Sequence, residues 1–349
     1  MFDITVNGDT PTAWAFIRAC NLHGTAHCSN PQVNAQHPTG RAGVLTPNLT
    51  KVVQALGLNE ALTEIAHQPD RAQVRFGRSA YLLSELPLGK FCADRYNAPL
   101  LNLQEDQFIE ILRTNQASRE SKPGINLQLD TLPGCSSTAP PSSPPETNPR
   151  YSVGVFVSEQ IASTANANIT WLNEGATIWQ FSTPDKTYFY ICNWRPERPL
   201  DIDDWHNSLH PAITGAKTLD EPTPITQQPS DNWYQGHVAY AGLAAYSTPS
   251  FWREHCWLGL EDAWVLSRML ENYEEDWSDA YAEYEKYRGA RGRRVARNLA
   301  ISWEQITRSN PIGKLTRNLN IALGTRFLPE IAMQKLDWQY GHDCIRGFR

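Results

Sequence analysis

The sequence predicts an α/β fold in which an antiparallel sheet is inserted between two parts of a larger unit and helices close the C-terminal end. Residues 2–7 alternate apolar and polar side chains like a first strand, and the helical pattern of 11–22 follows after a short turn. Strand-like segments dominate 151–192, and a long helical pattern covers 277–303. With 349 residues and 41% apolar content the chain can bury a large core, enough for roughly two domains or one large domain with an insertion.

Composition excludes several classes of partner. The formal net charge of −6 gives no general attraction to nucleic acid or acidic membranes, so we expect no nucleic-acid partner. No apolar run approaches the ~20 residues that span a bilayer, and Met1-Phe2-Asp3 does not begin like a signal peptide. The 7 cysteines are scattered without a CxxC motif, which favours reduced thiols and a cytoplasmic protein. The composition does not predict an oligomeric state.

The turn after the first strand reads Gly8-Asp9-Thr10-Pro11-Thr12-Ala13, at the place where dinucleotide-binding proteins carry GxGxxG. That motif works because missing side chains let backbone N–H groups and a helix N-terminus approach a pyrophosphate. Here Thr10 adds a branched side chain at the closest approach, and Asp9 adds a negative charge beside the expected diphosphate position. The turn therefore predicts a strand-turn-helix that binds no nucleotide, with a working cradle as the alternative.

A second strand-loop-helix unit lies at 236–270. It begins with the buried strand pattern Val238 to Ala241, continues through a loop, and ends in an amphipathic helix opened by Gly259-Leu260-Glu261-Asp262-Ala263. Glu261 and Asp262 fall in the first helical turn, where carboxylates oppose the positive end of the helix dipole. A strand, a ligand-facing loop and a helix N-terminus together predict a small-molecule site.

Three blocks of the chain resemble FAD-dependent aromatic hydroxylases, the class that contains salicylate and urate hydroxylases. They are the strand-loop-helix unit ending in Gly-Leu-Glu-Asp-Ala, the block from Gly40 to Pro47, and the C-terminal Leu336-Asp337-Trp338-Gln339-Tyr340-Gly341-His342-Asp343. The resemblance implies a Rossmann-like FAD-binding fold of the p-hydroxybenzoate hydroxylase type, with an inserted antiparallel substrate-domain sheet and C-terminal helices. The expected segments are a nucleotide-binding-like first part (1–130), a Pro/Ser-rich loop (131–150), the inserted sheet (151–230), and a return to the nucleotide-binding-like domain with the C-terminal helices (231–349).

The chain departs from this family at most blocks that contact flavin there. Acidic, histidine or arginine residues of the family are replaced at the second-strand end Ser29-Asn30, at Gln104, at Pro133, at Leu243 and at Tyr246. The family positions that remain are vestigial cofactor-binding residues: Gly8, Arg41, Gly134 and Gly242. If each lost contact is worth ~1–3 kcal/mol, FAD binding weakens by orders of magnitude. We therefore expect no cofactor, the alternative being a genuine hydroxylase that uses FAD with NAD(P)H.

Aromatic side chains suggest the ligand. Trp179, Phe181, Tyr188 and Tyr190 alternate along two strands that, in the resembled family, cover the substrate, although alternating aromatics are also typical of ordinary core. The loop after the strand at Val238 adds Tyr246, Pro249 and Trp252 as further substrate-binding candidates. This set predicts an apolar or aromatic small molecule as the partner.

The same loop supplies the candidate catalytic groups Arg253, Glu254 and His255, which would face the flavin ring in the family's geometry. Catalysis without a cofactor needs positioned acid–base groups and restraint of the substrate. We expect His255 to act as base or acid, Glu254 to orient it or relay its proton, and Arg253 to stabilise an anion. The hypothesis is a cofactor-independent isomerase, cyclase or dehydratase of secondary metabolism. An ordinary charged surface loop, and a non-catalytic binding partner, are the alternatives.

Two further charged patterns carry weaker predictions. His206 and His210 stand four residues apart behind Asp203 and Asp204, a spacing that can place two imidazoles on one helix face, but no HExxH motif is present and we expect no metal. The arginine-rich part of 277–303 can bind phosphate, although on a helix such a run is usually a solvated face.

Overall fold

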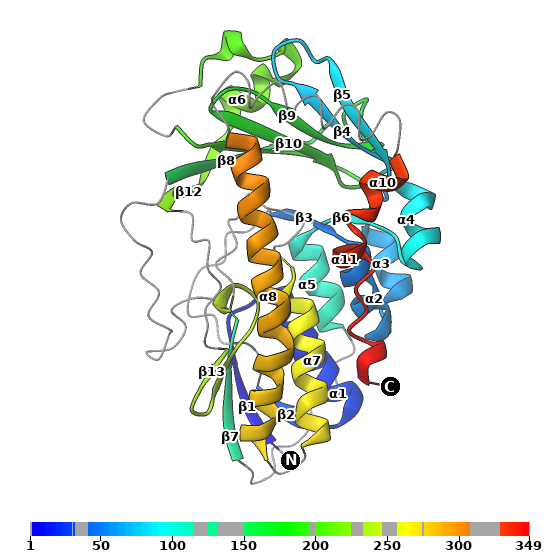
Figure 1. Ribbon diagram of the computed structural model, residues 1–349, viewed down its shortest axis with the longest axis vertical. Helices are drawn as coiled ribbons and strands as arrows, with labels where there is room; N and C mark the ends of the chain where they lie inside the picture. Colours follow the sequence, from blue (N-terminus) through cyan, green and yellow to red (C-terminus); the bar gives the residue numbers. More distant parts are fainter. Residues whose placement is uncertain are drawn as a thin grey trace.

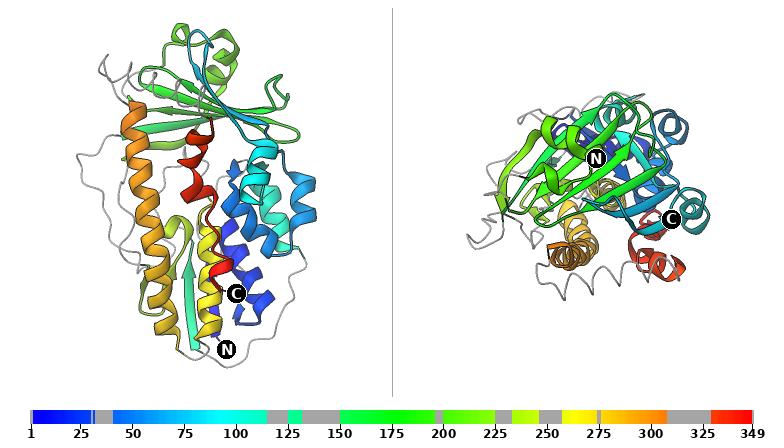
Figure 2. Two further views of the ribbon diagram at one scale, coloured as in Figure 1. Left: turned by 45° about the vertical axis from the view of Figure 1, so that its right-hand side comes forward. Right: turned by 90° about the horizontal axis from the view of Figure 1, so that it is seen from above.

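The computed structural model describes residues 2–29, 31, 41–114, 125–131, 150–195, 200–224, 233–245, 257–273, 276–307 and 329–348. The molecule is elongated, with one sheet near each end and a layer of short strands and helices between them (Figures 1 and 2). This arrangement is the α/β architecture with a second sheet that the sequence predicts.

The lower sheet in Figure 1 has five strands in the order β13-β14-β7-β1-β2. Its strands are β1 (Phe2–Asn7), β2 (Ala26–Cys28), β7 (Ile125–Asp130), β13 (Tyr234–Gln235) and β14 (Val238–Tyr240). β1 pairs in parallel with β2 and β7, and β7 pairs in parallel with β14. Three segments that are far apart in the sequence therefore build the parallel part of this sheet, which is typical of Rossmann-like units, and β13 joins its edge antiparallel to β14.

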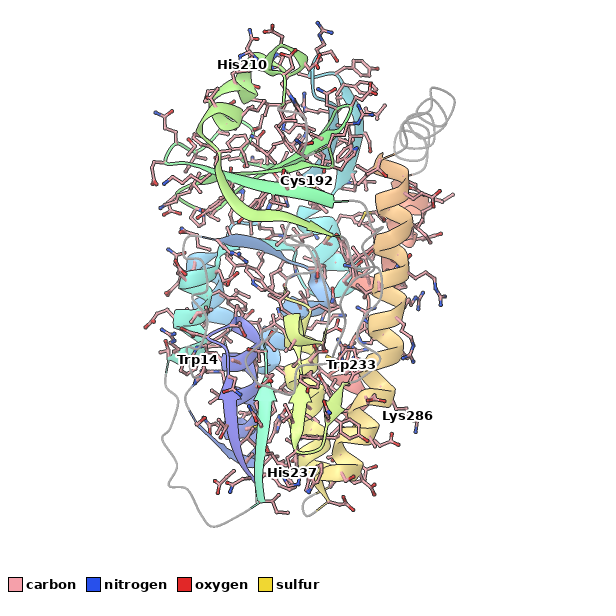
Figure 3. All side chains as sticks on the ribbon, turned by 90° about the vertical axis from the view of Figure 1, so that its left-hand side faces the viewer. Trp14, Cys192, His210, Trp233, His237 and Lys286 are labelled. Carbon is pink, nitrogen blue, oxygen red and sulfur yellow. The ribbon has the colours of Figure 1, made fainter. Side chains whose placement is uncertain are left out.

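Three helices complete this half of the molecule. They are α1 (Pro11–His23), α7 (Gly259–Asn272) and α8 (Trp277–Thr307). Figures 1 and 3 show α8 running along the molecule from the five-stranded sheet toward the other sheet. Phe2, Ile4 and Val6 of β1 are buried, as the period of two predicts. They join a large apolar core with side chains of α1 and α7.

The upper sheet has seven strands in the order β12-β8-β11-β10-β9-β4-β5. They are β4 (Arg71–Phe76), β5 (Leu82–Pro87), β8 (Arg150–Ser158), β9 (Ala167–Leu172), β10 (Ala176–Ser182), β11 (Thr187–Asn193) and β12 (Lys217–Pro224). The sequence analysis did not anticipate the β4–β5 hairpin, which comes from the first segment of the chain and joins this sheet through a parallel pairing of β4 with β9. The inserted sheet therefore also includes β4 and β5, which lie outside 151–230.

A small layer lies between the two sheets. It contains the antiparallel pair β3 (Ala42–Leu45) and β6 (Leu101–Gln104) and six short helices. The helices are α2 (Pro47–Ala55), α3 (Asn59–Ile65), α4 (Gly89–Tyr96), α5 (Glu105–Arg113), α10 (Pro329–Gln334) and α11 (Asp337–Tyr340). On the outer face of the seven-stranded sheet, α6 (His210–Gly215) and the short turns before it cover a separate apolar cluster.

Most of the expected elements are confirmed with small shifts at their ends. The first strand has the expected bounds, the strand at 125–130 is β7, and the helix expected at 277–303 extends to Thr307. No helix within the described ranges is long and apolar enough to cross a membrane.

Candidate functional site

The inner face of the seven-stranded sheet carries the predicted aromatic side chains. Trp179 and Phe181 of β10 and Tyr188 and Tyr190 of β11 belong to one apolar cluster, which also contains Ala42 of β3. The Phe181 ring is nearly parallel to those of Tyr188 and Tyr190, with centroids 5.8 and 5.9 Å apart. The structure therefore brings all four predicted residues together on the face that looks toward the rest of the chain, the face on which Figure 3 labels Cys192.

Tyr190 connects this face to the middle layer. Its hydroxyl accepts a hydrogen bond from the Ala42 N–H at 3.1 Å and donates one to the Ala42 carbonyl at 3.2 Å. Phe181, Tyr188 and Tyr190 are almost fully buried, and burial raises the pKa of the Tyr188 hydroxyl. Trp179 is partly exposed. In this conformation three of the four aromatics act as core, and the substrate-binding role of the set remains a prediction.

The turn before α1 is closed by hydroxyl groups. Thr10 caps α1, its Oγ1 accepting from the Ala13 N–H at 3.2 Å, and it also donates to Thr131 Oγ1 at 2.9 Å. Thr131 Oγ1 donates in turn to the Asn7 carbonyl at 2.8 Å. Pro11 has no N–H to offer. Thr10 stands at the second glycine position of GxGxxG. Its side chain lies against the first helical turn and bonds the Ala13 N–H, a donor that a bound phosphate would need.

Gly242 packs against Thr12 of this turn, and the structure explains why this position is a glycine. Its φ is +57°, and a Cβ at this position would meet Thr12 Oγ1 at 2.7 Å. Its N–H donates to Asp262 Oδ2 at 2.9 Å. Gly259, at the start of α7, also packs against Thr12. Gly242 thus serves the close packing of α1, α7 and the end of β14, whatever else it contacts.

Asp9 does not present an uncompensated charge, which corrects the sequence-based expectation. Its carboxylate accepts from Trp14 Nε1 at 2.7 Å and forms an ion pair with Arg113 of α5 at 2.7 Å. The Arg113 guanidinium also lies over the Trp14 ring, 4.8 Å from its centroid. Asp9 therefore fixes α1 against α5, because its charge is matched by a residue distant in the sequence.

Other predicted cofactor positions are also tied into the scaffold. Gln104, where the resembled family has an arginine, donates to Asp185 Oδ1 at 2.7 Å in the turn between β10 and β11. The Arg41 carbonyl accepts from the Glu105 N–H at 2.9 Å, and the residue is partly exposed. In the turn itself, the Thr10 N–H donates to the Gly8 carbonyl at 3.0 Å and the Ala13 N–H donates to Thr10 Oγ1 at 3.2 Å, so these two backbone donors already have partners.

The predicted catalytic residues Arg253, Glu254 and His255 lie outside the described residues. The same holds for the predicted ligand contacts Tyr246, Pro249 and Trp252 and for the vestigial cofactor position Gly134. Their roles remain predictions.

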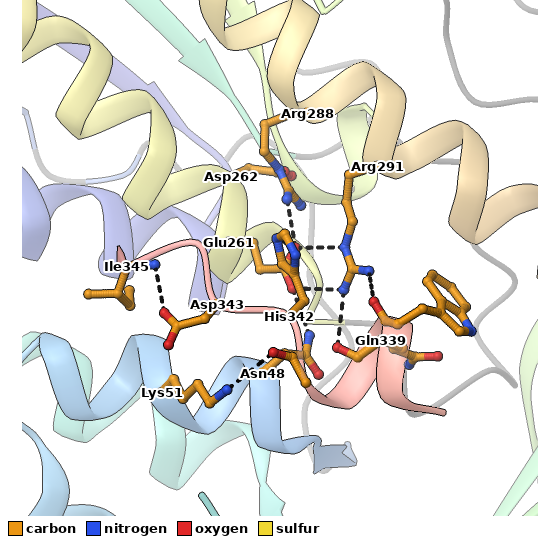
Figure 4. Close-up of polar contacts among 12 residues, drawn as sticks. Asn48, Lys51, Glu261, Asp262, Arg288, Arg291, Gln339, His342, Asp343 and Ile345 are labelled. Atoms are coloured by element: carbon orange, nitrogen blue, oxygen red, sulfur yellow. Dashed lines mark hydrogen bonds and ion pairs between the residues drawn. The ribbon is translucent and has the colours of Figure 1, made fainter. Parts of the chain in front are cut away.

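A buried ion network at the start of α7 was missed by the sequence analysis (Figure 4). Arg288 of α8 donates to Glu261 and to Asp262, both at 2.6 Å, and Arg291 donates to Glu261 at 3.1 Å. Asn48 of α2 donates to Glu261 at 2.7 Å. The side chains of Glu261, Asp262 and Arg288 are 0% exposed. The expectation of a solvated arginine face is therefore wrong for Arg288 and Arg291.

Burial and the neighbouring charges both act on the pKa values of Glu261 and of His342 in this network. Burial alone would raise the pKa of Glu261, but Arg291 and Arg288 hold that pKa well below its usual range. His342 Nε2 lies 3.8 Å from Glu261, yet burial lowers the pKa of His342 to about 4. Other arginines of α8, Arg293, Arg294 and Arg297, are exposed, as the sequence predicts. The missed signal was the pair of acids in the first turn of α7 together with arginines three residues apart on α8.

The histidines considered for a metal have other contacts. His206 precedes a short 3₁₀ turn and accepts from the Ser208 N–H at 3.4 Å, while His210 Nε2 lies 3.1 Å from the Trp205 carbonyl. The two residues begin different short elements, so they do not share the face of one continuous helix. Within the described ranges, no cluster of three or more potential metal ligands is present.

Comparisons with known proteins agree with this architecture. No protein-family model matches the chain. It is 20% identical over 301 residues to 6-hydroxynicotinate 3-monooxygenase of Pseudomonas fluorescens, covering 72% of this chain and 78% of that protein. Klebsiella pneumoniae HpxO complexed with FAD and uric acid superposes with a TM-score of 0.77 at 15% identity, over 96% of this chain and 97% of that one. A salicylate hydroxylase substrate complex gives 0.67 at 15% identity, over 98% and 96%.

These findings confirm the predicted fold class and the resemblance stated from the sequence. The chain has the fold of FAD-dependent monooxygenases of the p-hydroxybenzoate hydroxylase type, and its neighbours in sequence and structure are such enzymes. The identities are low, so the likeness establishes the fold and leaves the chemistry to be argued from this chain's own residues.

Proposed function

We propose that the protein acts on an aromatic or apolar small molecule between its two sheets, and that it does so without FAD held in the GxGxxG manner. The observation that carries the proposal is the Thr10 side chain, which caps α1 and bonds Thr131 at the position where a diphosphate needs open backbone donors. Proline at the first helical position removes a further donor. The aromatic cluster on β10 and β11 supports an apolar or aromatic ligand.

The reaction class that suits such a site is redox-neutral: an isomerisation, a cyclisation, or an elimination that releases water. An isomerase, cyclase or dehydratase needs only positioned acid–base groups and a substrate held in a reactive shape. Arg253, Glu254 and His255 are the proposed catalytic groups, with His255 transferring the proton, Glu254 orienting it and Arg253 stabilising developing negative charge. Secondary metabolism and a cytoplasmic location are further parts of this proposal that rest on the sequence.

A second candidate function is an FAD-dependent aromatic monooxygenase that uses NAD(P)H. It is favoured by the relatives, since one is a 6-hydroxynicotinate 3-monooxygenase and another binds FAD and uric acid. In that case Gly8, Arg41, Gly134 and Gly242 would be the residues nearest the cofactor, and flavin would supply oxygen activation. The two candidates predict different affinities for FAD, so they can be separated without knowing the substrate.

The first experiment is the visible absorption spectrum of the purified protein, before and after incubation with excess FAD and gel filtration. The proposal predicts no retained flavin band in either sample. A stoichiometric flavin band would contradict the proposal and favour the FAD-dependent monooxygenase. Difference spectra with simple aromatic probes such as benzoate and naphthoate then test whether an apolar ligand binds.

The catalytic assignment is tested by His255→Ala and Glu254→Ala once a turnover assay exists. Loss of activity by about 10²-fold or more in His255→Ala is expected for a general acid or base. His206→Ala is the matched control and should retain activity, because this histidine lies beside the outer face of the seven-stranded sheet. Unchanged product formation in both variants would remove these residues as catalysts, and a protein that binds aromatics without turnover would be a non-catalytic binding partner.

A further inference from the structure

A polar cavity lies apart from both sheets, between α2, the end of α4 and the C-terminal segment. Its volume is about 520 Å³, and small-molecule sites span ~300–1,000 Å³. Polar side chains from three separate parts of the chain line it, among them Lys51, Arg95, Tyr96, Asn97, Asp343 and Arg346. None of these residues belongs to the aromatic cluster or to the turn before α1. We call this space the basic cavity.

Positive charge exceeds negative charge around the basic cavity. Lys51, Arg95 and Arg346 line it, whereas Asp343 is the one carboxylate among its lining residues. Arg346 pairs with Asp343 at 3.3 Å. Arg95 is held by Asp337, just outside the lining, through two hydrogen bonds of 2.8 and 2.7 Å. With both acids matched by arginines, the Lys51 ammonium supplies the excess charge.

Lys51 has unused donor capacity. Its Nζ donates to the Gly341 carbonyl at 3.4 Å, a long hydrogen bond, and within the described part of the chain no carboxylate forms an ion pair with it. An ammonium group has three donors. Burial lowers the pKa of Lys51 although Asp343 acts in the opposite direction. A partly buried cation of this kind is a favourable anchor for an anion, because a ligand restores the solvation that burial removes.

The wall opposite Lys51 is held in place by the buried ion network. Arg291 donates to the Trp338 carbonyl at 2.9 Å and to the Gln339 carbonyl at 3.4 Å, which fixes the C-terminal segment against α7 and α8. The Asp343 carboxylate accepts from the Ile345 and Arg346 N–H groups at 3.1 and 3.2 Å. Figure 4 shows Lys51 reaching from α2 toward this segment. The cavity is thus preorganised, so little ordering cost opposes ligand binding.

We propose that the basic cavity is a second binding site, for the oxyanion group of a small metabolite. Lys51 anchors the phosphate or carboxylate. Arg346 donates to it from the opposite wall, through the guanidinium N–H groups that do not bond Asp343. Tyr96, Ala55 and Ile345 line the same cavity and contact the remainder of the ligand. Arg95 is a positioning residue, because its bidentate pair with Asp337 holds α4 against α11.

Calorimetric titration with inorganic phosphate and with citrate, each at constant ionic strength set by sodium chloride, tests the proposal. Wild-type protein is expected to bind at least one of the two anions saturably, and the preferred anion separates a phosphate site from a carboxylate site. Lys51→Met and Arg346→Gln are each expected to weaken binding at least about tenfold, which corresponds to the loss of one charge-assisted contact. Lys286→Met is the matched control, since Lys286 is 75% exposed on α8 and pairs with Glu283.

Absence of saturable binding to either anion, or undiminished binding by Lys51→Met, overturns the proposal. Equal weakening in Lys286→Met also overturns it, because the effect would then be general electrostatics. Arg346 is 71% exposed, so Arg346→Gln gives a well-folded test if Lys51→Met is unstable. The outcome does not depend on flavin affinity, which is governed by a different part of the molecule.

Discussion

The starts of helices α1 and α7 meet at Thr12, Gly242 and Gly259, and the chain satisfies their polar groups in opposite ways. At α1 the buried groups are neutral hydroxyls, with Thr10 and Thr131 bonded to each other and to the backbone, while the ion pair of Asp9 with Arg113 is partly exposed. At α7 they are full charges, each facing an opposite charge on α8. Buried ion pairs therefore hold the start of α7, whereas bonds between neutral hydroxyls occupy the buried side of the adjoining turn.

The largest loss of stability is expected when one charge is removed from the α7 network. Arg288→Met leaves Glu261 and Asp262 buried without their common partner, and breaking a buried ion pair in this way costs ~3–5 kcal/mol. Urea unfolding followed by circular dichroism should therefore show a much lower midpoint or no folded baseline.

Arg297→Met on the exposed side of the same helix is the control for that change. It should alter the free energy of unfolding by no more than about 0.5 kcal/mol. If Arg288→Met is equally mild, the network does not stabilise the fold as the geometry indicates.

The next largest effect concerns pH. The pKa of His342 is about 4 in the folded chain and ~6.5 when unfolded, so protonation favours the unfolded chain. The stabilisation is complete above the unfolded pKa and is lost as pH falls toward the folded one, about 2 kcal/mol between about pH 7 and about pH 5. His342→Gln should remove that part of the slope in urea unfolding measured across this range. Parallel slopes for wild type and variant would refute the assignment to His342.

A smaller effect is expected at the closed turn of α1. Thr10→Ala removes the helix cap and the bond to Thr131, which together cost about 1–2 kcal/mol. Thr63→Ala, at an exposed threonine of α3 that bonds its own helix, is the matched control and should change the unfolding free energy by less than about 0.5 kcal/mol. Equal, small effects in the two variants would show that the hydroxyl chain does not hold the turn.

The smallest predicted effect lies at the aromatic face. Tyr190→Phe keeps the ring stack and deletes the hydroxyl that bonds Ala42, so a loss of about 1 kcal/mol is expected. Tyr81→Phe, at a 60% exposed tyrosine, should be neutral. A stability gain in Tyr190→Phe would mean that this hydroxyl is not a link between the inserted sheet and β3.

Local patterns in the sequence were sufficient to predict the strands that bury one face. Val6 and its alternate neighbours predict β1, and the alternation of Phe181 with Trp179 predicts the inner face of β10, since a strand places every second residue on one side. The hairpin β4–β5 escaped prediction because its facing positions are polar. Gln73 of β4 donates to Glu85 of β5 at 2.6 Å, and such cross-strand pairs leave little apolar alternation to detect.

The parts of the site that sequence analysis misjudged depend on partners far away along the chain. Asp9 is neutralised by Arg113, 104 positions later, and Arg288 reaches Asp262 from the neighbouring helix. A charged residue has the same local appearance whether it meets solvent or a distant opposite charge, so its burial follows only from the assembled core. By contrast, Thr10 in place of glycine could be identified from the sequence, because its position in the GxGxxG spacing is local, although its bond to Thr131 could not.

A fluorescence titration of FAD with the purified protein tests most directly the proposal that the turn before α1 does not hold a dinucleotide. No saturable change in FAD fluorescence is expected up to protein concentrations of about 100 μM, a Kd weaker than ~10⁻⁴ M. Saturable quenching with a Kd at or below ~1 μM would contradict the proposal and favour a flavin-binding monooxygenase with unusual contacts.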